Sequence, residues 1–343
     1  MKHKAHGKSR KIVVSGSVAF DYLMTFPGKF SDVVVPDRMN RLSVSFLVDE
    51  MRRVRGGVAP NIAYTLSLLG ADAAILATAG PDAADYRAWL ESEGIDVSGM
   101  TICEDLFTAS FFVSTDVDQN QIATFYAGAM ARARELSLRH YGAWNVSLCL
   151  VGPNDPAAMR THAKECREMG IPFVYDPSQQ VARLSGEEIV EGLAGAAILI
   201  GNEYEFGIIE KKTTLSESEL LSRVPVVIVT RGAEGSTIAL RGGTAENPDG
   251  ARTIRIPPAA VRGEALDPTG VGDAFRGGLL AARAKGLPWE VAGRVGAVAA
   301  VFALETTGPQ PKRYSRVEFA ERYRRDFGSD ADAGDVGRLW GAS

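Results

Sequence analysis

An alternation of short apolar segments and longer amphipathic segments constrains the fold of this 343-residue chain more than any other feature. Apolar segments typical of buried strands occur at 74–79, 147–151, 172–176, 197–201 and 226–230. Segments with helical periodicity lie among them, near 83–93, 157–169, 186–194 and 216–222. Strands that are separated by helices usually pair in parallel. The order therefore predicts an α/β fold in which helices cover both faces of a mostly parallel sheet.

The two ends of the chain extend this pattern. The run Ile12-Val13-Val14 suits a buried first strand. Further helices are expected near 273–286, 289–304 and 315–326, because apolar residues recur there with helical spacing. We expect one domain over residues 11–328, flanked by a basic tail at 1–10 and a C-terminal tail at 329–343.

A second, smaller sheet is predicted from segments that interrupt the α/β units. Residues 42–48, 107–115 and 121–126 are rich in the β-branched and aromatic residues that favour strands. We expect them to form an inserted lid, with lid strands from about 22–56 and 105–128. A lid of this kind can exclude water from a reaction that takes place beneath it.

Composition and charge exclude several classes of function. The 38 basic and 42 acidic residues give a net charge of −4, so no basic field is available to bind a nucleic acid. No apolar run reaches the roughly 20 residues that span a bilayer, and the first residues lack the apolar core of a secretion signal. Cys103, Cys149 and Cys166 form neither a disulfide framework nor a metal-binding pair, which predicts a cytoplasmic protein.

The stretch 266–278, Leu-Asp-Pro-Thr-Gly-Val-Gly-Asp-Ala-Phe-Arg-Gly-Gly, places Gly270 and Gly272 before a helix-compatible run. Free N–H groups at a helix start bind anions, and glycines let the backbone approach a phosphate. An aspartate aimed at such a site is repelled by the anion, so packing alone does not favour it there. A base that accepts a hydroxyl proton during phosphoryl transfer needs that position. Asp273 is therefore a candidate base, with simple capping of the helix as the alternative.

This stretch resembles the signature of the ribokinase family of carbohydrate and nucleoside kinases, also called the phosphofructokinase-B type, which reads Asp-Thr-x-Gly-Ala-Gly-Asp. Here Pro268 follows Asp267, and Val271 replaces the alanine. The resemblance implies a ribokinase-like three-layer α/β/α fold with a small β-sheet lid. It also implies that Asp273 is the catalytic base. The anion hole is expected to consist of the amides of Gly270, Val271, Gly272 and Asp273.

Two further motifs are candidates to bind a sugar. Asp21 follows the predicted first strand, where ligands of parallel sheets gather, and a carboxylate can accept hydrogen bonds from two neighbouring hydroxyls. The resemblance assigns the sugar hydroxyls to Asp21, with Ser17 beside it; a turn aspartate is the alternative. The segment 55–63 resembles the first signature of the family, in which Gly57 belongs to the lid hinge and Asn61 contacts a ribose hydroxyl. A plain N-cap is the alternative for Asn61.

Other residues are candidates to bind the rest of the substrate. Phe111 and Phe125 suit stacking on a flat group, with packing in the lid or core as an equal alternative. Gln179 and Gln180 offer donors and acceptors that match the edge of a nucleobase. The resemblance adds Ser45 as a contact from the lid.

A third group of residues is expected to bind MgATP. Residues 202–205 fit the family motif Asn-x-x-Glu, in which Asn202 lies near the phosphates and Glu205 holds Mg²⁺ through water. By itself this pattern more often marks an exposed glutamate at a helix start. The resemblance places ATP against a loop after the strand 226–230, and also against Gly272. The alternative interpretation of this loop is an ordinary hairpin. That loop consists of Thr230, Arg231, Gly232, Ala233, Glu234 and Gly235. Family members often hold K⁺ near residues 307–310, though no residue type here establishes such a site.

Within this family, residues 11–327 are similar to the bacterial adenosine kinases, notably at 17–24, 43–49, 115–118 and 176–180. The resemblance implies transfer of the γ-phosphate of ATP to the 5′-hydroxyl of adenosine to give AMP, a step of purine salvage, with Mg²⁺, by a homodimer joined through its lids. The alternatives are a ribokinase- or fructokinase-type sugar kinase, a broader nucleoside kinase, and a non-enzymatic protein that senses nucleosides. No P-loop and no dinucleotide-binding glycine motif is present.

Overall fold

The computed structural model describes residues 10–33, 44–141, 145–245, 247, 249–328 and 331–340. Residues 1–9 of the predicted basic tail and residues 34–43 of the predicted lid region lie outside the described residues. Within the described part, no helix has both the length and the apolar character needed to cross a bilayer.

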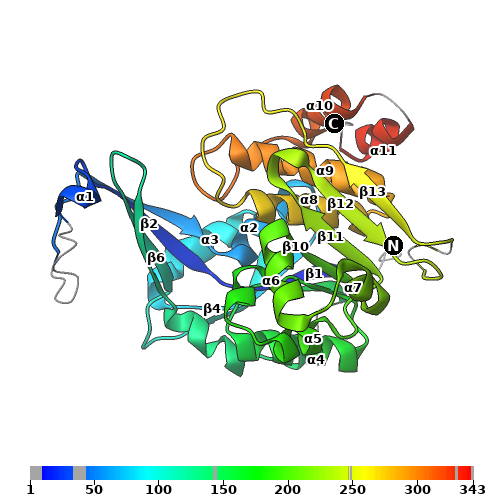
Figure 1. The fold of residues 1–343 in the computed structure, drawn as a ribbon, viewed down its shortest axis with the longest axis horizontal. Coiled ribbons are helices and arrows are strands. Elements are labelled where there is room, and N and C mark those ends of the chain that lie inside the picture. Colours follow the sequence, from blue (N-terminus) through cyan, green and yellow to red (C-terminus); the bar gives the residue numbers. More distant parts are fainter. Residues whose placement is uncertain are drawn as a thin grey trace, which may run out of the picture.

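A nine-stranded sheet forms the centre of the molecule (Figure 1). Its order is β13-β12-β11-β10-β9-β8-β1-β4-β5, and all pairs are parallel except those made by β12. The strands are β1 (Lys11–Ser15), β4 (Ala73–Ala79), β5 (Asp96–Ile102), β8 (Val146–Val151), β9 (Phe173–Tyr175), β10 (Ile198–Asn202), β11 (Val226–Thr230), β12 (Ser236–Leu240) and β13 (Arg252–Ile256). The predicted mostly parallel sheet is confirmed.

Two hydrophobic cores lie on opposite faces of this sheet. Ile12 and Val14 of β1 belong to one core, and Val13 between them belongs to the other, because successive side chains point to opposite faces. This is why the strands have continuous apolar runs. The first core contains α2 (Val58–Leu68), α3 (Ala84–Ser92), α8 (Val271–Ala284), α9 (Trp289–Leu304), α10 (Arg316–Phe327) and α11 (Ala331–Trp340). The second contains α4 (Pro156–Met169), α5 (Gly186–Leu193), α6 (Glu203–Thr213) and α7 (Glu217–Arg223).

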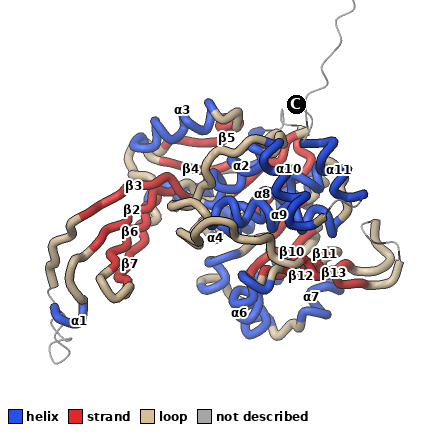
Figure 2. The backbone as a smooth tube through the Cα atoms, turned by 90° about the horizontal axis from the view of Figure 1, so that it is seen from above, coloured by secondary structure: helices blue, strands red, loops and turns tan. Residues whose placement is uncertain are grey.

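The second sheet has four strands and projects from one side of the molecule, with α1 (Phe30–Val33) near its tip (Figure 2). Its order is β3-β2-β6-β7; β2 pairs in parallel with β6, and the other pairs are antiparallel. The strands are β2 (Ala19–Thr25), β3 (Glu50–Gly56), β6 (Ala109–Thr115) and β7 (Gln121–Tyr126). The predicted small sheet is therefore present as part of the confirmed fold class.

Some predicted elements are wrong. Residues 44–48, which belong to the predicted strand 42–48, form no strand, and the strand is β3 instead. Helix α2 begins at Val58, so the helix start lies before Asn61. The predicted C-terminal tail contains α11, because Trp340 is buried in the first core and donates from Nε1 to the carbonyl of Leu69 at 2.8 Å.

Candidate active site

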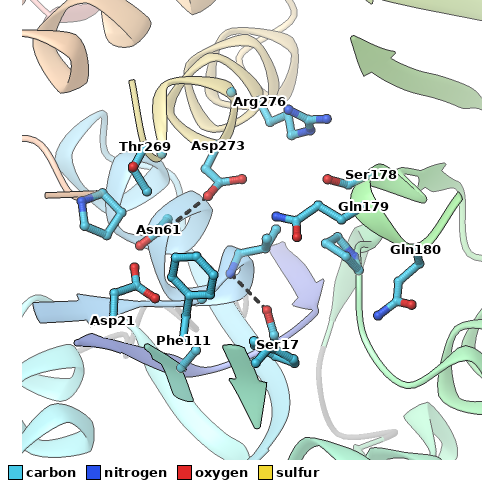
Figure 3. Close-up of a pocket in the computed structure, with 18 of the residues that line it drawn as sticks. Ser17, Asp21, Asn61, Phe111, Ser178, Gln179, Gln180, Thr269, Asp273 and Arg276 are labelled. Atoms are coloured by element: carbon cyan, nitrogen blue, oxygen red, sulfur yellow. Dashed lines mark hydrogen bonds between the residues drawn. The ribbon is translucent and has the colours of Figure 1, made fainter. Parts of the chain in front are cut away.

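A cavity of about 600 Å³ opens where the carboxyl ends of the central strands meet the start of α8 and the small sheet (Figure 3). Its polar lining comes from segments far apart in the chain. The residues predicted for the site that line it are Ser17, Asp21, Gly57, Asn61, Phe111, Phe125, Gln179, Gln180, Asn202, Glu205, Gly270, Gly272 and Asp273. Val271, Ser45 and residues 230–235 were predicted for the site but do not line this cavity.

Asp273 lies in the first turn of α8, whose N-cap is Gly270. Gly270 has a φ of 77°, and an added Cβ would lie 2.0 Å from the carbonyl oxygen of Pro309, so only glycine fits there. The helix has no side-chain cap, so the alternative reading of Asp273 as a cap is wrong. Within the described residues, the N–H groups of Gly272 and Asp273 have no hydrogen-bond partner. The helix start thus presents free donors beside a carboxylate.

Asn61 fixes the orientation of the Asp273 carboxylate. Its Nδ2 donates to Asp273 Oδ2 at 2.9 Å. Gln310 Nε2 donates to Asn61 Oδ1 at 3.2 Å and to the Tyr86 hydroxyl at 2.6 Å, and that hydroxyl donates to the carbonyl of Gly56. Asn61 is 4% exposed and lies inside α2, whose N-cap is Gly57, so its alternative role as an N-cap is wrong.

Burial raises the pKa of Asp273 to about 6, against the opposing effects of the Arg276 charge and the Asn61 hydrogen bond. Burial and the nearby charge of Asp267 raise the pKa of Asp21 to about 6 as well. A carboxylate with a pKa near 6 is ionised at pH 7 and is still basic enough to take a proton in a transition state. Both groups face the same cavity.

Asp21, Phe111 and Phe125 occupy one cross-strand row of the small sheet. Asp21 is paired with Phe111 in the register of β2 and β6, and Phe111 with Phe125 in that of β6 and β7. All three side chains line the cavity, and Phe125 is 52% exposed. Asp21 belongs to a strand, so its alternative reading as a turn aspartate is wrong. The row presents a carboxylate beside two aromatic rings.

The glycine pair before α2 packs tightly against the connection between β1 and β2. An added Cβ at Gly56 would lie 2.8 Å from Asp21 Oδ2, and one at Gly57 would lie 2.6 Å from the carbonyl oxygen of Ser17. The N–H of Val58 also donates to the hydroxyl of Ser17 at 3.3 Å. The pair therefore brings Asp21 and Ser17 close to the start of α2.

Asn202 and Glu205 form a reciprocal cap at the start of α6. Asn202 Oδ1 accepts from the N–H of Glu205 at 2.8 Å, and Glu205 Oε2 accepts from the N–H of Asn202 at 2.7 Å. Glu205 is only 6% exposed, so the reading of an exposed helix-start glutamate is wrong. The hydroxyl of Ser178 donates to Glu205 Oε1 at 3.3 Å. One carboxylate with spare acceptor capacity fits a metal held through water.

Residues 230–235 connect β11 to β12 as a hairpin, closed by a hydrogen bond from the N–H of Arg231 to the carbonyl of Gly235. Thr230 lies opposite Asn202 in the sheet, so the hairpin adjoins the cavity without lining it. Arg231 forms an ion pair with Glu203. On the lid side, Ser45 is exposed. Among the described residues, no group of three or more His, Cys, Asp or Glu side chains is placed to hold a metal alone.

Sequence reasoning missed a buried ion pair and an arginine on the cavity wall. Arg276 Nε lies 2.5 Å from Asp176 Oδ2, and its Nη2 donates to Asp176 Oδ1 at 2.8 Å. Arg183, which follows the two glutamines, also lines the cavity. The spacing of Arg276, three residues after Asp273, indicates the same side of the helix, but the pattern does not reveal Asp176 as its partner.

Comparisons with known proteins are consistent with this geometry. Residues 17–314 match the pfkB family of carbohydrate kinases. A nucleoside kinase of Methanothermobacter thermautotrophicus is 29% identical over 324 residues, which cover 94% of this chain and 98% of that protein.

Two solved structures superpose on the chain with a TM-score of 0.80. One is Burkholderia thailandensis nucleoside kinase in complex with inosine, at 35% identity over 93% of this chain and 98% of its own. The other is the nucleoside kinase of Methanocaldococcus jannaschii, an archaeal member of the ribokinase family, at 27% identity over 93% and 99%. The predicted ribokinase-like fold is confirmed.

Proposed function

The chain belongs to the pfkB family of carbohydrate kinases, and from this premise we propose that it is an ATP-dependent nucleoside kinase. The observation that carries the proposal is the position of Asp273. Its carboxylate is held by Asn61 beside the free N–H groups of a helix start, in a cavity that also presents Asp21 and two aromatic rings. This set suits a ribose, a flat base and a phosphoryl group together.

In the proposed reaction, each region of the cavity acts on one part of the substrates. Asp21 accepts hydrogen bonds from ribose hydroxyls, and Phe111 and Phe125 stack on the base. Gln180 adds a buried Oε1 without a partner among the described residues, which suits a donor on the base. Asp273 accepts the proton of the 5′-hydroxyl as the oxygen attacks the γ-phosphorus. The amides of Gly272 and Asp273 stabilise the charge that develops on the phosphoryl oxygens.

The nucleotide side of the proposal rests on Asn202, Glu205 and residues 230–235, which adjoin the phosphoryl position. ATP is the proposed phosphate donor. When Mg²⁺ is bound with ATP, it neutralises phosphate charge and orients the terminal phosphate. Glu205 fits a water-mediated contact to that ion, because within the described part of the chain its Oε1 accepts a single long hydrogen bond, from Ser178.

We propose purine nucleosides as acceptors, with adenosine among them and AMP as its product. The first comparison structure contains inosine, which supports a broader acceptor range than adenosine alone. We also propose a role in purine salvage in the cytoplasm. A homodimer through the small sheets remains a proposal; the edge strand β7 supports it, because all six of its residues are exposed, including Ile122 and Tyr126.

The test is an ATP-consumption screen of the full-length protein with Mg²⁺ over adenosine, inosine, guanosine, ribose and fructose. Products are identified by mass and by the ³¹P NMR signal of a 5′-monophosphate. The proposal predicts turnover with nucleosides and its loss in the Asp273→Asn variant. Preference for a free sugar would replace the proposal with a sugar kinase. Tight nucleoside binding without turnover would favour a sensor.

A further inference from the structure

Arg276 is a buried cation at the wall of the cavity. It lies three residues after Asp273 on α8, is only 6% exposed, and lines the cavity. Its Nε and Nη2 both face the carboxylate of Asp176. The third nitrogen, Nη1, has no partner among the described residues. Asp176 therefore orients the guanidinium and leaves Nη1 free to donate to a ligand.

The free nitrogen lies beside the anion-binding start of the helix. A Cβ added at Gly272 would lie 2.8 Å from Arg276 Nη1. Gly272 has one of the two free N–H groups, so the guanidinium and the main-chain donors border the same small space. Figure 3 shows Arg276 and Asp273 leaving the same helix toward the cavity, with Ser178 and Gln179 opposite. Gly272 thus makes room for this guanidinium.

The charges around Arg276 keep it protonated. Burial alone would lower its pKa, but the carboxylates of Asp176, Asp273 and Glu205 raise the pKa above its ordinary value. A second cation, Arg183, lies on the exposed part of the cavity wall. Three carboxylates would repel an incoming phosphate, and Arg276 is the buried charge that offsets them. An ion pair with Asp176 alone does not require a position next to Gly272.

We propose that Arg276 is a catalytic residue, whose Nη1 donates a hydrogen bond to the phosphoryl group during its transfer, and that Asp176 is its positioning residue. This role rests on the proposed kinase function. The 5′-oxygen of the nucleoside forms a bond to the γ-phosphorus, and the bond from that phosphorus to the β–γ bridging oxygen breaks. The bridging oxygen keeps the electron pair and leaves with ADP, and the 5′-hydroxyl proton passes to Asp273.

The main rival role is indirect. Arg276 lowers the pKa of Asp273, so its removal would raise that pKa and shift the acid limb of the pH–rate profile to higher pH. In that case the plateau of kcat at high pH would stay at the wild-type level. Loss of a direct contact in the transition state lowers the plateau itself. A pH–rate profile therefore separates the two roles.

The experiment compares Arg276→Met with the wild type and with Lys285→Met, which removes a cation from the exposed end of the same helix. We measure kcat with saturating MgATP and adenosine from pH 5 to 9, the two KM values, and adenosine binding without ATP. Arg276→Met is expected to lower the kcat plateau by about 10²- to 10³-fold, as for loss of one transition-state donor. Adenosine affinity is expected to stay within about twofold, and Lys285→Met to match the wild type.

Removal of Arg276 alone leaves Asp176 buried without its partner, which can impair folding. The double variant Arg276→Met/Asp176→Asn removes both charges and is tested in parallel, with folding checked by circular dichroism. Arg276→Lys keeps the positive charge but lacks the planar guanidinium with its several donors. It is expected to recover only part of the kcat that Arg276→Met loses. A folded variant with a wild-type plateau, or with only a raised KM, overturns the proposal. A wild-type chain without nucleoside turnover overturns the kinase function itself, and this role with it.

Discussion

Asp273 and Asp21 face one cavity from two different regions of the molecule, and burial raises the pKa of each to about 6. Asp273 stands on α8, a helix of the first core, and its carboxylate accepts a hydrogen bond from Asn61. Asp21 lies on the small sheet, and its side-chain carboxylate has no hydrogen-bond partner among the described residues. The same charge is thus held by fixed partners in one region and left available in the other.

The two carboxylates are suited to different tasks. A base must be held in place before the reaction, and the network of Asn61, Gln310 and Tyr86 provides that order. A carboxylate without partners gains most from a ligand that donates to it, because the ligand then replaces lost water. Among the described residues, the apolar clusters in and beside the small sheet are small: one consists of Ala19, Ala109 and Met130, and another of the rings of Phe26, Phe30 and Phe46. We infer chemistry on the packed helix and recognition on the small sheet.

The largest expected effect is that of Asp273→Asn. Asparagine keeps the shape and accepts from Asn61 but takes no proton, so kcat is expected to fall by about 10²- to 10⁴-fold. Adenosine binding is expected to change little. Steady-state kinetics and calorimetry of the same preparation measure the two quantities. Near-normal turnover would show that Asp273 is not the base, and the assignment of chemistry to α8 would then be wrong.

The second effect is that of Asp21→Asn, which is expected to raise the KM for the nucleoside by about 10- to 100-fold, because charge-assisted hydrogen bonds to the ribose are lost. The kcat is expected to fall much less than in Asp273→Asn. Ribose and 2′,3′-dideoxyadenosine serve as probes of the same contact in binding competition. If Asp21→Asn lowers kcat as strongly as Asp273→Asn with KM unchanged, the division between the two regions does not hold.

The sequence predicted the packed region better than the small sheet, for physical reasons. Apolar strands such as β4 and β11 are buried on both faces, so their composition reveals them. Strand β3 has the sequence Glu-Met-Arg-Arg-Val-Arg-Gly, and it forms because it pairs with β2 over seven residues. No local preference of charged residues indicates that pairing.

The candidate site shows the same contrast. The glycine motif and Asp273 are adjacent in sequence, so their chemistry could be inferred before the fold was known. The ion pair of Asp176 and Arg276 joins residues 100 positions apart, and it depends on the packing of α8 against the end of β9. The helix α11 was missed because its place depends on two buried side chains, Val336 and Trp340, which pack into the first core far from α11 in sequence. Long-range packing leaves no periodic signal.

The third effect concerns the aromatic rings of the small sheet. Phe125→Ala is expected to weaken adenosine binding by about tenfold, because stacking of a base on an aromatic ring is worth about 1–3 kcal/mol. The matched control is Phe112→Ala, since Phe112 neighbours Phe111 on β6, does not line the cavity, and stacks on Tyr22 at 4.6 Å. The control is expected to lower the melting temperature and to leave the affinity for adenosine nearly unchanged. Equal losses of affinity would mean that the sheet acts only through its stability.

The smallest expected effect is on stability and its dependence on pH. The pKa of Asp273 is about 6 in the folded protein and near 3.8 as the ordinary value, so the folded state binds more protons between these limits. Stability contributed by this group is therefore full below pH 4 and is lost as the pH rises through 6. Asp273→Asn removes the cost of the buried charge, so it is expected to stabilise the protein at pH 7.5 by on the order of 1 kcal/mol. At pH 4 the two proteins are expected to melt alike.

Thermal melts at both pH values measure this difference in stability, with the exposed Asp85→Asn as the surface control. Equal melting temperatures at pH 7.5 would show that the Asp273 charge is compensated by its partners, and the contrast with the unpartnered Asp21 would then be sharper than the pKa values indicate.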